Sequence, residues 1–406
     1  MKILNFGSCN IDLVYSVEHI VNPGETISAL DVNRYPGGKG LNQSIALANA
    51  GASVWHAGCI GSDGLFLIDI MKSRGVDTRY IKELPCINGQ AFIQVNPKGE
   101  NSIVVYGGSN VMIQKEHIDE VLDDFSSGDF ILLQNEINNI DYIIDKAYSK
   151  DMKIVLNPSP FNKVIGSVPL EKISYLILNE IEAASYLGND NVSEFVNWVR
   201  DKYPKLKVVL TLGKSGCIYF DKDDIVRQNS YRVDAVDTTA AGDTFTGYFI
   251  AETARGKLPK EALDTASVAS AISVSRNGAA SSIPTYDEVT KLRCSMTENS
   301  TSPIQHVVYE YFEKHYLDAD INALAAQLGY SQAYLTRWLK KHTGKTFSQH
   351  ILDVRCRAAK ELLQTTDLSV SQIIEKVGYT NQTFFRKAFC EKYGVSPSEI
   401  RKKNKK

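Results

Sequence analysis

The sequence predicts an α/β layer fold over roughly the first 290 of its 406 residues, followed by an all-α domain. Three observations support this division. In the first part, short apolar runs alternate with helical patterns, as in a parallel sheet covered by helices on both faces. Two segments in that part instead alternate apolar and polar residues. After about residue 303 every periodic pattern is helical.

The apolar runs predict the strands of the main sheet in chain order, with helices expected near 41–51 and 65–74. Because the runs are apolar throughout, both faces of this sheet are expected to be buried. The predicted strands are "ILNFGS" (3–8), "SVWHAGCIG" (53–61), "FILLQNE" (130–136), "KIVLNP" (153–158), "YLILNE" (175–180) and "VVLTLG" (208–213).

The alternating segments predict a second, smaller sheet. They are "IDLVYSVE" at 11–18 and the pair "QAFIQVN" at 90–96 and "NSIVVYG" at 101–107, which a Pro-Lys-Gly-Glu turn joins. Alternation around such a turn indicates an antiparallel flap with one side facing solvent or a partner. We expect this flap to act as a lid over a ligand or as a dimer surface.

A polar, Ser/Thr-rich segment predicts the domain boundary. "CSMTENSTSP" at 294–303 reads as a linker between a first domain, 1–293, and a second domain, 304–406. The second domain is basic, with 17 Lys and Arg against 10 Asp and Glu, whereas the remainder of the chain is acidic. We therefore expect only the second domain to face a polyanion.

The second domain contains a weak internal repeat. "LAAQLGYSQAYLTRWLKKHTG" (324–344) resembles "IIEKVGYTNQTFFRKAFCEKYG" (373–394). Each copy predicts a short helix, a Gly-Tyr turn and a second helix that Ser331 or Thr380 caps, which is a helix-turn-helix layout. A helix over roughly 347–364 would hold the two units at a fixed separation.

Composition excludes several classes of protein. The seven cysteines are scattered and never spaced as Cys-x-x-Cys, which disfavours a disulfide framework and a zinc site. No signal-type leader and no stretch approaching about 18 uninterrupted apolar residues is present. These features predict a cytoplasmic protein.

Two glycine-containing motifs carry the chemistry of the first domain. In "GGKGLNQSIALANAG", from Gly37 to Gly51, glycines precede an amphipathic helix whose free N–H groups suit an oxygen-rich ligand, although such turns are often purely structural. In "VDTTAAGDTFTGYF" (236–249), small residues lead into Asp243 and a helix. The amides of 240–242 can form an anion hole, and Asp243 can take a proton from a hydroxyl, although a lone Gly-Asp is more often a helix cap.

In this order and about 200 residues apart, the two motifs resemble the ribokinase (PfkB) family of sugar kinases. The resemblance covers residues 1–293 and implies the ribokinase-like three-layer fold with a small β lid. The intermediate motifs that match are "GSCNID" (7–12), "NPGET" (22–26), "QNE" (134–136), "NPSP" (157–160), "NEIEA" (179–183), "TLGKSG" (211–216) and "RNGAASSIP" (276–284).

The resemblance implies an ATP-dependent transfer to a sugar hydroxyl, with Asp243 as the base and Ala240, Ala241 and Gly242 as the anion hole. It implies Mg²⁺ as cofactor and K⁺ as activator. The residues implied for the sugar are Asn10, Asp12, Gly38, Lys39, Asn42, Glu136 and Asp243; for the nucleotide, Asn179, Thr211, Gly213 and Gly216; for Mg²⁺ through water, Glu182; and for the monovalent cation, Asp237, Thr239, Ser273, Arg276, Gly278 and Ser282.

The second domain resembles the DNA-binding domain of AraC/XylS-family transcription regulators over its whole length. Besides the repeats, "RCRAAKELLQTT" (355–366) and "YGVSPSEIR" (393–401) match. Polar residues near the start of each second helix are expected to contact DNA, whereas apolar and aromatic residues at helical spacing are expected in the core. The expected DNA contacts are Gln332, Thr336, Arg337, Gln382, Thr383, Arg386 and Lys387; the expected core residues are Tyr334, Leu335, Trp338, Phe385 and Phe389.

Three functions fit these patterns: an active sugar kinase that also regulates transcription, a regulator whose kinase-like domain senses a sugar or nucleoside, and a kinase that uses its tail only for localisation on nucleic acid. The first is favoured because the motif around Asp243 and both recognition helices are complete. D-ribose is the first choice of substrate, with deoxyribose, fructose-type sugars and nucleosides as alternatives. Dimerisation through the lid is expected.

Overall fold

The structure is a computed structural model of the chain, and it describes residues 1–406 except 232, 300–302, 329, 367, 380 and 404–406. Side chains are described for the same residues except 294–299, 303–306, 309, 310, 342, 402 and 403. The chain divides into two compact units, Met1–Met296 and Thr297–Lys406. The division lies within the predicted linker at 294–303, and helix α9 (Tyr286–Asn299) continues into that segment.

The first unit is built on a nine-stranded sheet of order β13-β12-β11-β10-β9-β8-β1-β4-β5. The strands from β11 to β5 are parallel, whereas β12 and β13 are antiparallel additions. The sequence did not predict β12, β13 or the parallel edge strand β5. The strands are β1 (Ile3–Phe6), β4 (Val54–Gly61), β5 (Asp77–Leu84), β8 (Phe130–Gln134), β9 (Lys153–Asn157), β10 (Tyr175–Asn179), β11 (Lys207–Thr211), β12 (Cys217–Phe220) and β13 (Ile225–Gln228).

Helices cover both faces of this sheet, which confirms the predicted three-layer fold. Successive strand residues point to opposite faces, so Ile3 and Leu132 belong to one buried cluster while Leu4 and Leu133 belong to another. The helices of the unit are α1 (Lys39–Asn49), α2 (Leu65–Ser73), α3 (Lys115–Asp123), α4 (Ile140–Ser149), α5 (Glu180–Leu187), α6 (Val192–Lys202), α7 (Ala241–Ala254), α8 (Pro259–Val274) and α9.

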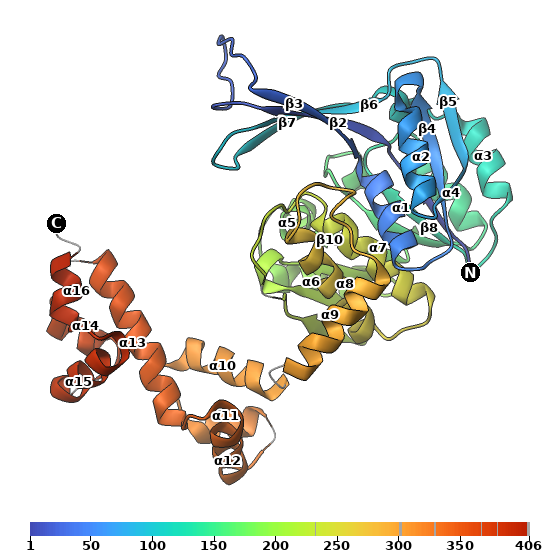
Figure 1. Cartoon of the computed structure of the whole chain (residues 1–406). Coiled ribbons are helices and arrows are strands. Elements are labelled where there is room, and N and C mark those ends of the chain that lie inside the picture. Colours follow the sequence, from blue (N-terminus) through green and yellow to red (C-terminus); the bar gives the residue numbers. More distant parts are fainter. Residues whose placement is uncertain (232, 300–302, 329, 367, 380, 404–406) are drawn as a thin grey trace. The chain divides into compact units, whose positions relative to one another are not determined.

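A four-stranded sheet of order β3-β2-β6-β7 forms the lid and extends from the body of the unit (Figure 1). Its strands are β2 (Asn10–Ser16), β3 (Asp31–Gly37), β6 (Gly89–Val95) and β7 (Asn101–Tyr106). The β6–β7 hairpin is antiparallel as predicted, but β2 pairs with β6 in parallel, and β3 was not predicted. The polar, exposed sequence "DVNRYPG" gives β3 no apolar run to recognise.

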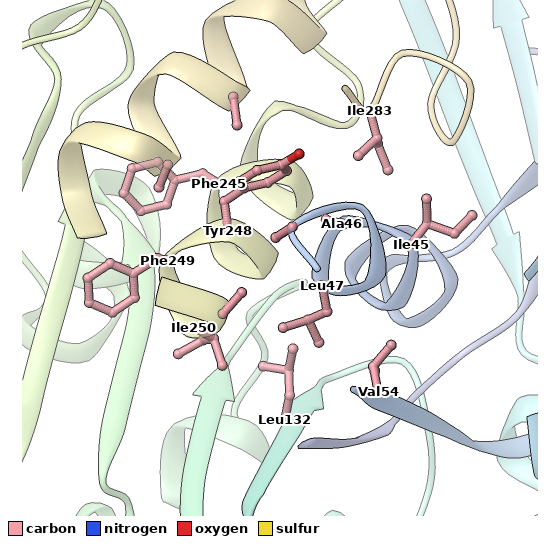
Figure 2. Close-up of a cluster of buried hydrophobic side chains, with 14 of the residues drawn as sticks. Ile45, Ala46, Leu47, Val54, Leu132, Phe245, Tyr248, Phe249, Ile250 and Ile283 are labelled. Atoms are coloured by element: carbon pink, nitrogen blue, oxygen red, sulfur yellow. The ribbon is translucent and has the colours of Figure 1, made fainter. Parts of the chain in front are cut away.

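Helices α1 and α7 pack closely in the core of the first unit. Figure 2 shows Ala46 and Leu47 of α1 beside Tyr248 and Ile250 of α7. The approach depends on Gly247, because a Cβ added there would lie 2.4 Å from the Ala46 Cβ and 2.9 Å from the Leu47 backbone nitrogen. This contact sets the distance between the motifs that begin the two helices.

We expect Gly247→Ala to lower the free energy of unfolding by about 1–3 kcal/mol, since helix backbone must shift to admit the methyl group. Urea unfolding of the full chain measures this change. Gly242→Ala is the matched control, because a Cβ at Gly242 meets no atom within 4 Å. Equal stabilities for the two variants would contradict the close packing of α1 on α7.

The second unit is helical, with two cores along one long helix, α13. One core gathers residues of α10 to α12 against α13, and the other gathers residues of α14 to α16 against its second half (Figure 1). The helices are α10 (Pro303–His315), α11 (Ile321–Gln327), α12 (Gln332–Thr343), α13 (Phe347–Thr365), α14 (Val370–Lys376), α15 (Gln382–Tyr393) and α16 (Pro397–Lys403).

Side chains of α13 also tie the two helix-turn-helix units together. Asp353 forms ion pairs of 2.6 Å with Lys345, before α13, and with Lys392 of α15. Arg355 donates to the carbonyls of Tyr316 and Leu317 on one side and of Gly378 on the other. Because one helix makes both sets of contacts, the two units have a defined separation.

Candidate active site and nucleic-acid interface

The candidate active site lies where parallel strands of the large sheet end and helices begin. Glu136 follows β8, Asn179 ends β10, and Thr211, which pairs with Asn179 in register, ends β11. In open α/β sheets this edge is where ligands bind. The structure therefore brings to one edge residues that are far apart in the sequence.

Asp243 lies in the first turn of α7 and is 5% exposed. Its carboxylate accepts hydrogen bonds from Asn42 Nδ2 at 3.0 Å and from Gln43 Nε2 at 2.9 Å, both on α1. Burial raises the pKa of Asp243, while nearby Lys39 and the two amide donors oppose the rise. The buried Oδ1 of Asn42 has no hydrogen-bond partner, so it can accept a bond from a ligand hydroxyl.

Glu136 links the end of β8 to the start of α1. Its Oε2 accepts from the Ser8 hydroxyl at 2.5 Å and from the Lys39 backbone N–H at 2.9 Å. Burial lowers the pKa of the Lys39 ammonium, but Asp243, Glu136 and Glu182 outweigh it and raise that pKa. Lys39 is therefore a stable positive charge among three carboxylates, suited to a phosphate group.

The base of the lid supplies Asn10 and Asp12. Asn10 is buried, and its Oδ1 accepts from Asn110 Nδ2 at 2.7 Å. Asp12 lies against Gly37, where a Cβ would come within 2.2 Å of both carboxylate oxygens. Burial, together with Glu136 and Asp243, raises the pKa of Asp12 to about 7. Its charge thus changes near neutral pH.

We expect the KM for the sugar to rise as the pH falls from 8 to 6, by about five- to tenfold, because protonated Asp12 accepts fewer hydrogen bonds from sugar hydroxyls. Initial rates over this range measure the effect. In Asp12→Asn the KM should be high and independent of pH. A wild-type KM that stays constant from pH 8 to 6 would contradict this assignment.

The predicted anion hole lies at the N-terminus of α7, whose first residues are Ala241 and Gly242. Gly242 is exposed, while Ala240 is buried. The Ala241 N–H donates to the Thr238 carbonyl at 3.2 Å, so that amide is already engaged within the loop. The open approach to Gly242 and the helix dipole make this end of α7 suitable for an anion.

The predicted nucleotide residues form two local structures. Asn179 and Glu182 make a capping box at the start of α5: the Glu182 N–H donates to Asn179 Oδ1 at 2.8 Å, and the Asn179 N–H donates to Glu182 Oε2 at 3.1 Å. Gly213 and Gly216 have positive φ in the turn after β11, and a Cβ on Gly216 would lie 2.1 Å from the Gln228 carbonyl oxygen. The first lies at the C-terminal end of β10, and the second lies at the C-terminal end of β11.

The residues predicted for a monovalent cation lie on the loop before α7, at the end of α8 and on the loop that follows α8. Asp237 Oδ1 accepts from Thr239 N–H and Oγ1, and Asp237 Oδ2 accepts from the Gly278 N–H at 3.0 Å. The Ser273 and Ser282 hydroxyls lie 2.8 Å apart. Arg276 forms an ion pair with Glu288 at 2.6 Å, which leaves its carbonyl as the group available to a cation.

Each helix-turn-helix unit exposes polar residues on its second helix. On α12, Gln332, Thr336 and Arg337 are exposed; on α15, Thr383 and Lys387 are exposed, while Gln382 and Arg386 are half-buried. These side chains are the available contacts for a DNA groove.

One prediction for the second unit was wrong: Tyr334 is 41% exposed rather than part of the core, unlike Leu335, Trp338, Phe385 and Phe389, which are buried. Tyr334 is the third residue after the Ser331 cap, on the outer side of α12. Phe384 takes the same place after the cap of α15 and is 53% exposed. That cap is Asn381, which accepts from the Phe384 N–H at 3.0 Å, whereas Thr380 lies outside the described residues.

Sequence reasoning missed several polar residues that hold the site together. Gln43 bonds both Asp243 and Asn157, and Asn110 holds Asn10. Asn88 donates to the Cys9 carbonyl and accepts from the Gly61 N–H, which fixes the base of the lid. These residues could have been found as polar residues within otherwise apolar segments. Gln43 in particular lies inside the glycine-rich motif from Gly37 to Gly51.

Comparisons with known proteins match both parts of the chain. A family model for the pfkB family carbohydrate kinases matches residues 1–286, and a model for a helix-turn-helix domain matches residues 324–403. A ribokinase of Staphylococcus aureus is 34% identical over 307 residues, which cover 72% of this chain and 99% of that protein. A deoxyribokinase of Salmonella typhi is 29% identical over 299 residues, covering 71% of this chain and 97% of that protein.

Solved structures show the same relationship. The crystal structure of ribokinase from Thermotoga maritima is 32% identical to this chain and superposes with a TM-score of 0.66, covering 72% of this chain and 99% of that one. The described helices of this chain include none long and apolar enough to cross a membrane.

Proposed function

The chain belongs to the pfkB family of carbohydrate kinases, and we propose that it transfers phosphate from ATP to D-ribose, giving ribose 5-phosphate. From the match to a helix-turn-helix domain we also propose that its second domain binds specific DNA. The observation that carries the first part is the buried Asp243 carboxylate, which two α1 amides hold at the N-terminus of α7.

In this proposal Asp243 takes the proton of the sugar's primary hydroxyl. The hydroxyl oxygen attacks the γ-phosphorus of ATP, the bond from that phosphorus to the bridging oxygen breaks, and ADP leaves. Lys39 and the start of α7 stabilise the charge that develops on the phosphate oxygens. Asp12, Asn42 and Glu136 orient the sugar through its other hydroxyls.

Mg²⁺ fits the oxygen-rich edge near Glu182, whose Oε1 is not used by the capping box. When bound with ATP, Mg²⁺ neutralises phosphate charge. Asn179 and Glu182 would hold it through water. K⁺ fits beside the Asp237 loop, where the hydrogen bonds of Thr239 and Gly278 lower the pKa of Asp237 against the opposing effect of burial and keep it ionised.

The choice of ribose is supported by the ribokinases among the relatives, and the deoxyribokinase makes 2-deoxyribose the main competitor. A coupled assay of ADP release over pentoses, hexoses and nucleosides tests the choice. We expect the highest kcat/KM with D-ribose. A preference for any other sugar or for a nucleoside would overturn the proposed substrate while leaving the kinase activity intact.

The DNA-binding proposal is supported by two exposed recognition helices on a common scaffold. The 19-residue helix α13 is about 28 Å long, so the two units would reach major-groove segments about one DNA turn apart. Tyr334 and Phe384 stand outward at matched positions, where an aromatic ring can contact a thymine methyl group. We also propose that the protein is cytoplasmic, which agrees with the use of ATP by its first domain and with the reduced cysteines of the described chain.

We also propose that two copies associate through the lid. The lid face that carries Asp12 also carries Tyr35, Ile103 and Val105, which are 45%, 51% and 57% exposed. A second lid would cover this apolar surface. Sedimentation should show a wild-type dimer and an Ile103→Glu monomer, with Lys98→Glu at the exposed hairpin turn as control. A monomeric wild-type protein at micromolar concentration would contradict this proposal.

A further inference from the structure

A chain of buried polar side chains leads from Asp243 into the core of the first unit. Gln43 and Ser44 belong to α1, and the others stand on the three central strands β1, β4 and β8. Each member has 0% of its surface exposed; the members are Gln43, Gln134, Asn5, Ser44 and His56. Amides and an imidazole are costly to bury without partners, and in this series every polar side-chain atom except Oε1 of Gln134 has one.

The hydrogen bonds of this chain are short and continuous. Gln134 Nε2 donates to Gln43 Oε1 at 2.7 Å and to Asn5 Oδ1 at 2.9 Å. Asn5 Nδ2 donates to the Gly40 carbonyl at 2.7 Å and to Ser44 Oγ at 2.8 Å. Ser44 Oγ lies 2.8 Å from Nδ1 of His56.

The ionised Asp243 carboxylate fixes the direction of every bond, because it can only accept. The NH₂ group of Gln43 therefore donates to Asp243, and the Gln43 oxygen faces Gln134. Because that oxygen can only accept, Gln134 donates to it through its own NH₂ group. The same NH₂ group meets the oxygen of Asn5, and the Asn5 NH₂ group then faces Ser44. No amide in the chain can flip without breaking a buried bond.

His56 ends the chain as a neutral acceptor. Burial lowers the pKa of His56 to about 4, although a hydrogen bond with the Gly7 backbone opposes this shift. Ser44 accepts from Asn5, so its own hydrogen is available to Nδ1 of His56. The imidazole proton is then on Nε2, 3.3 Å from the Cys9 sulfur.

We propose that His56, Ser44, Asn5 and Gln134 are positioning residues for phosphate transfer, which act by holding Gln43 in the one orientation that donates to Asp243. This inference rests on the proposed role of Asp243 as the base. When Ser44 is replaced, Asn5 keeps its bond to the Gly40 carbonyl and Gln43 keeps its bond to Asn157 Oδ1. The hydrogen-bonded series is therefore loosened, and the bond from Gln43 to Asp243 Oδ1 weakens in part. The carboxylate then loses stabilisation, and its proton is harder to remove.

Three other charged groups face Asp243 and remain in place in such variants. Lys39 of α1 favours its ionised form, while Asp12 of β2 and Glu136 after β8 lie near enough for their own pKa values to rise through its charge. None of the three bonds to the chain through Ser44 or His56. A change in the titration of Asp243 on breaking the chain is therefore assigned to Gln43.

The test is the pH profile of kcat in the full-length protein, with Ser44→Ala and His56→Phe as variants. We expect the acid limb to move up by roughly half a pH unit, so that kcat on the acid side of the limb falls about threefold while kcat on the alkaline plateau stays within about twofold of wild type. Ser44→Thr keeps the hydroxyl and should restore the limb. The matched control is Ile45→Val, an equally buried α1 residue outside the chain.

Epistasis with Gln43 completes the test, because the proposal requires Ser44 to act through that amide. Gln43→Met should shift the limb more than Ser44→Ala does, and adding Ser44→Ala to Gln43→Met should move it no further. The proposed positioning role would be overturned if the acid limb of the kcat profile stayed in place in the folded Ser44→Ala and His56→Phe variants. It would also be overturned if the shifts caused by Ser44→Ala and Gln43→Met were fully additive. Loss of the base assignment itself would show separately, as turnover by Asp243→Asn.

Discussion

Asp243→Asn is expected to lower kcat by at least about a thousandfold while leaving the affinity for ribose within a few-fold of wild type. The amide has no basic oxygen to take the hydroxyl proton, yet it fills the same buried place between Asn42 and Gln43. The coupled ADP assay measures the first quantity, and titration calorimetry with ribose measures the second.

Two comparisons make the Asp243 result specific. Asp145→Asn makes the same chemical change in an exposed ion pair with Lys172 and should retain full activity. Thermal unfolding should show that Asp243→Asn is folded, since removal of a buried charge does not create a cavity. Turnover near the wild-type rate in the folded variant would show that another group acts as the base.

Arg337→Ala combined with Lys387→Ala is expected to weaken specific DNA binding by at least about a hundredfold. Each change removes an exposed cation from one recognition helix, and base or phosphate contacts of this kind contribute about 1–3 kcal/mol each. Fluorescence anisotropy on promoter fragments of the host's sugar operons, at several salt concentrations, measures both affinity and the number of phosphate contacts.

Arg357→Ala is the control for the DNA experiment. Arg357 is an equally exposed cation of the same domain, but it lies on α13 and pairs with Glu313. We expect it to change specific binding by less than about threefold. If the wild-type protein binds no promoter fragment more tightly than random DNA, the domain is not a sequence-specific regulator.

The parallel core of the fold was predictable because its strands are continuous apolar runs. β3, β5, β12 and β13 were not. β3 and β5 are polar strands at sheet edges, and β12 and β13 are four-residue strands that extend the sheet in antiparallel pairing. The parallel pairing of β2 and β6 was not predictable either, because local alternation indicates a strand but not its partner.

The candidate site could be predicted where one short motif contains both the small residues and the carboxylate that the chemistry needs, as in the motif that contains Asp243. The buried chain behind it could not be, because Asn5 and His56 stand in the apolar runs "ILNF" and "VWHAG" and are about fifty residues apart. Only the pairing of β1 with β4 in register, Asn5 opposite His56, places them together. Tyr334 was wrongly predicted in the core because helical spacing shows which residues share a face of α12 but not how much of that face other helices bury.

The proposed kinase activity is tested most directly by ADP release from the purified full-length protein in the presence of ATP, Mg²⁺ and D-ribose. We expect ribose-dependent turnover with kcat of at least about 1 s⁻¹, and a product whose phosphate is on the 5-hydroxyl. Ribose that binds, as shown by calorimetry, but supports no ADP release above background would contradict this proposal and leave the first domain as a sensor.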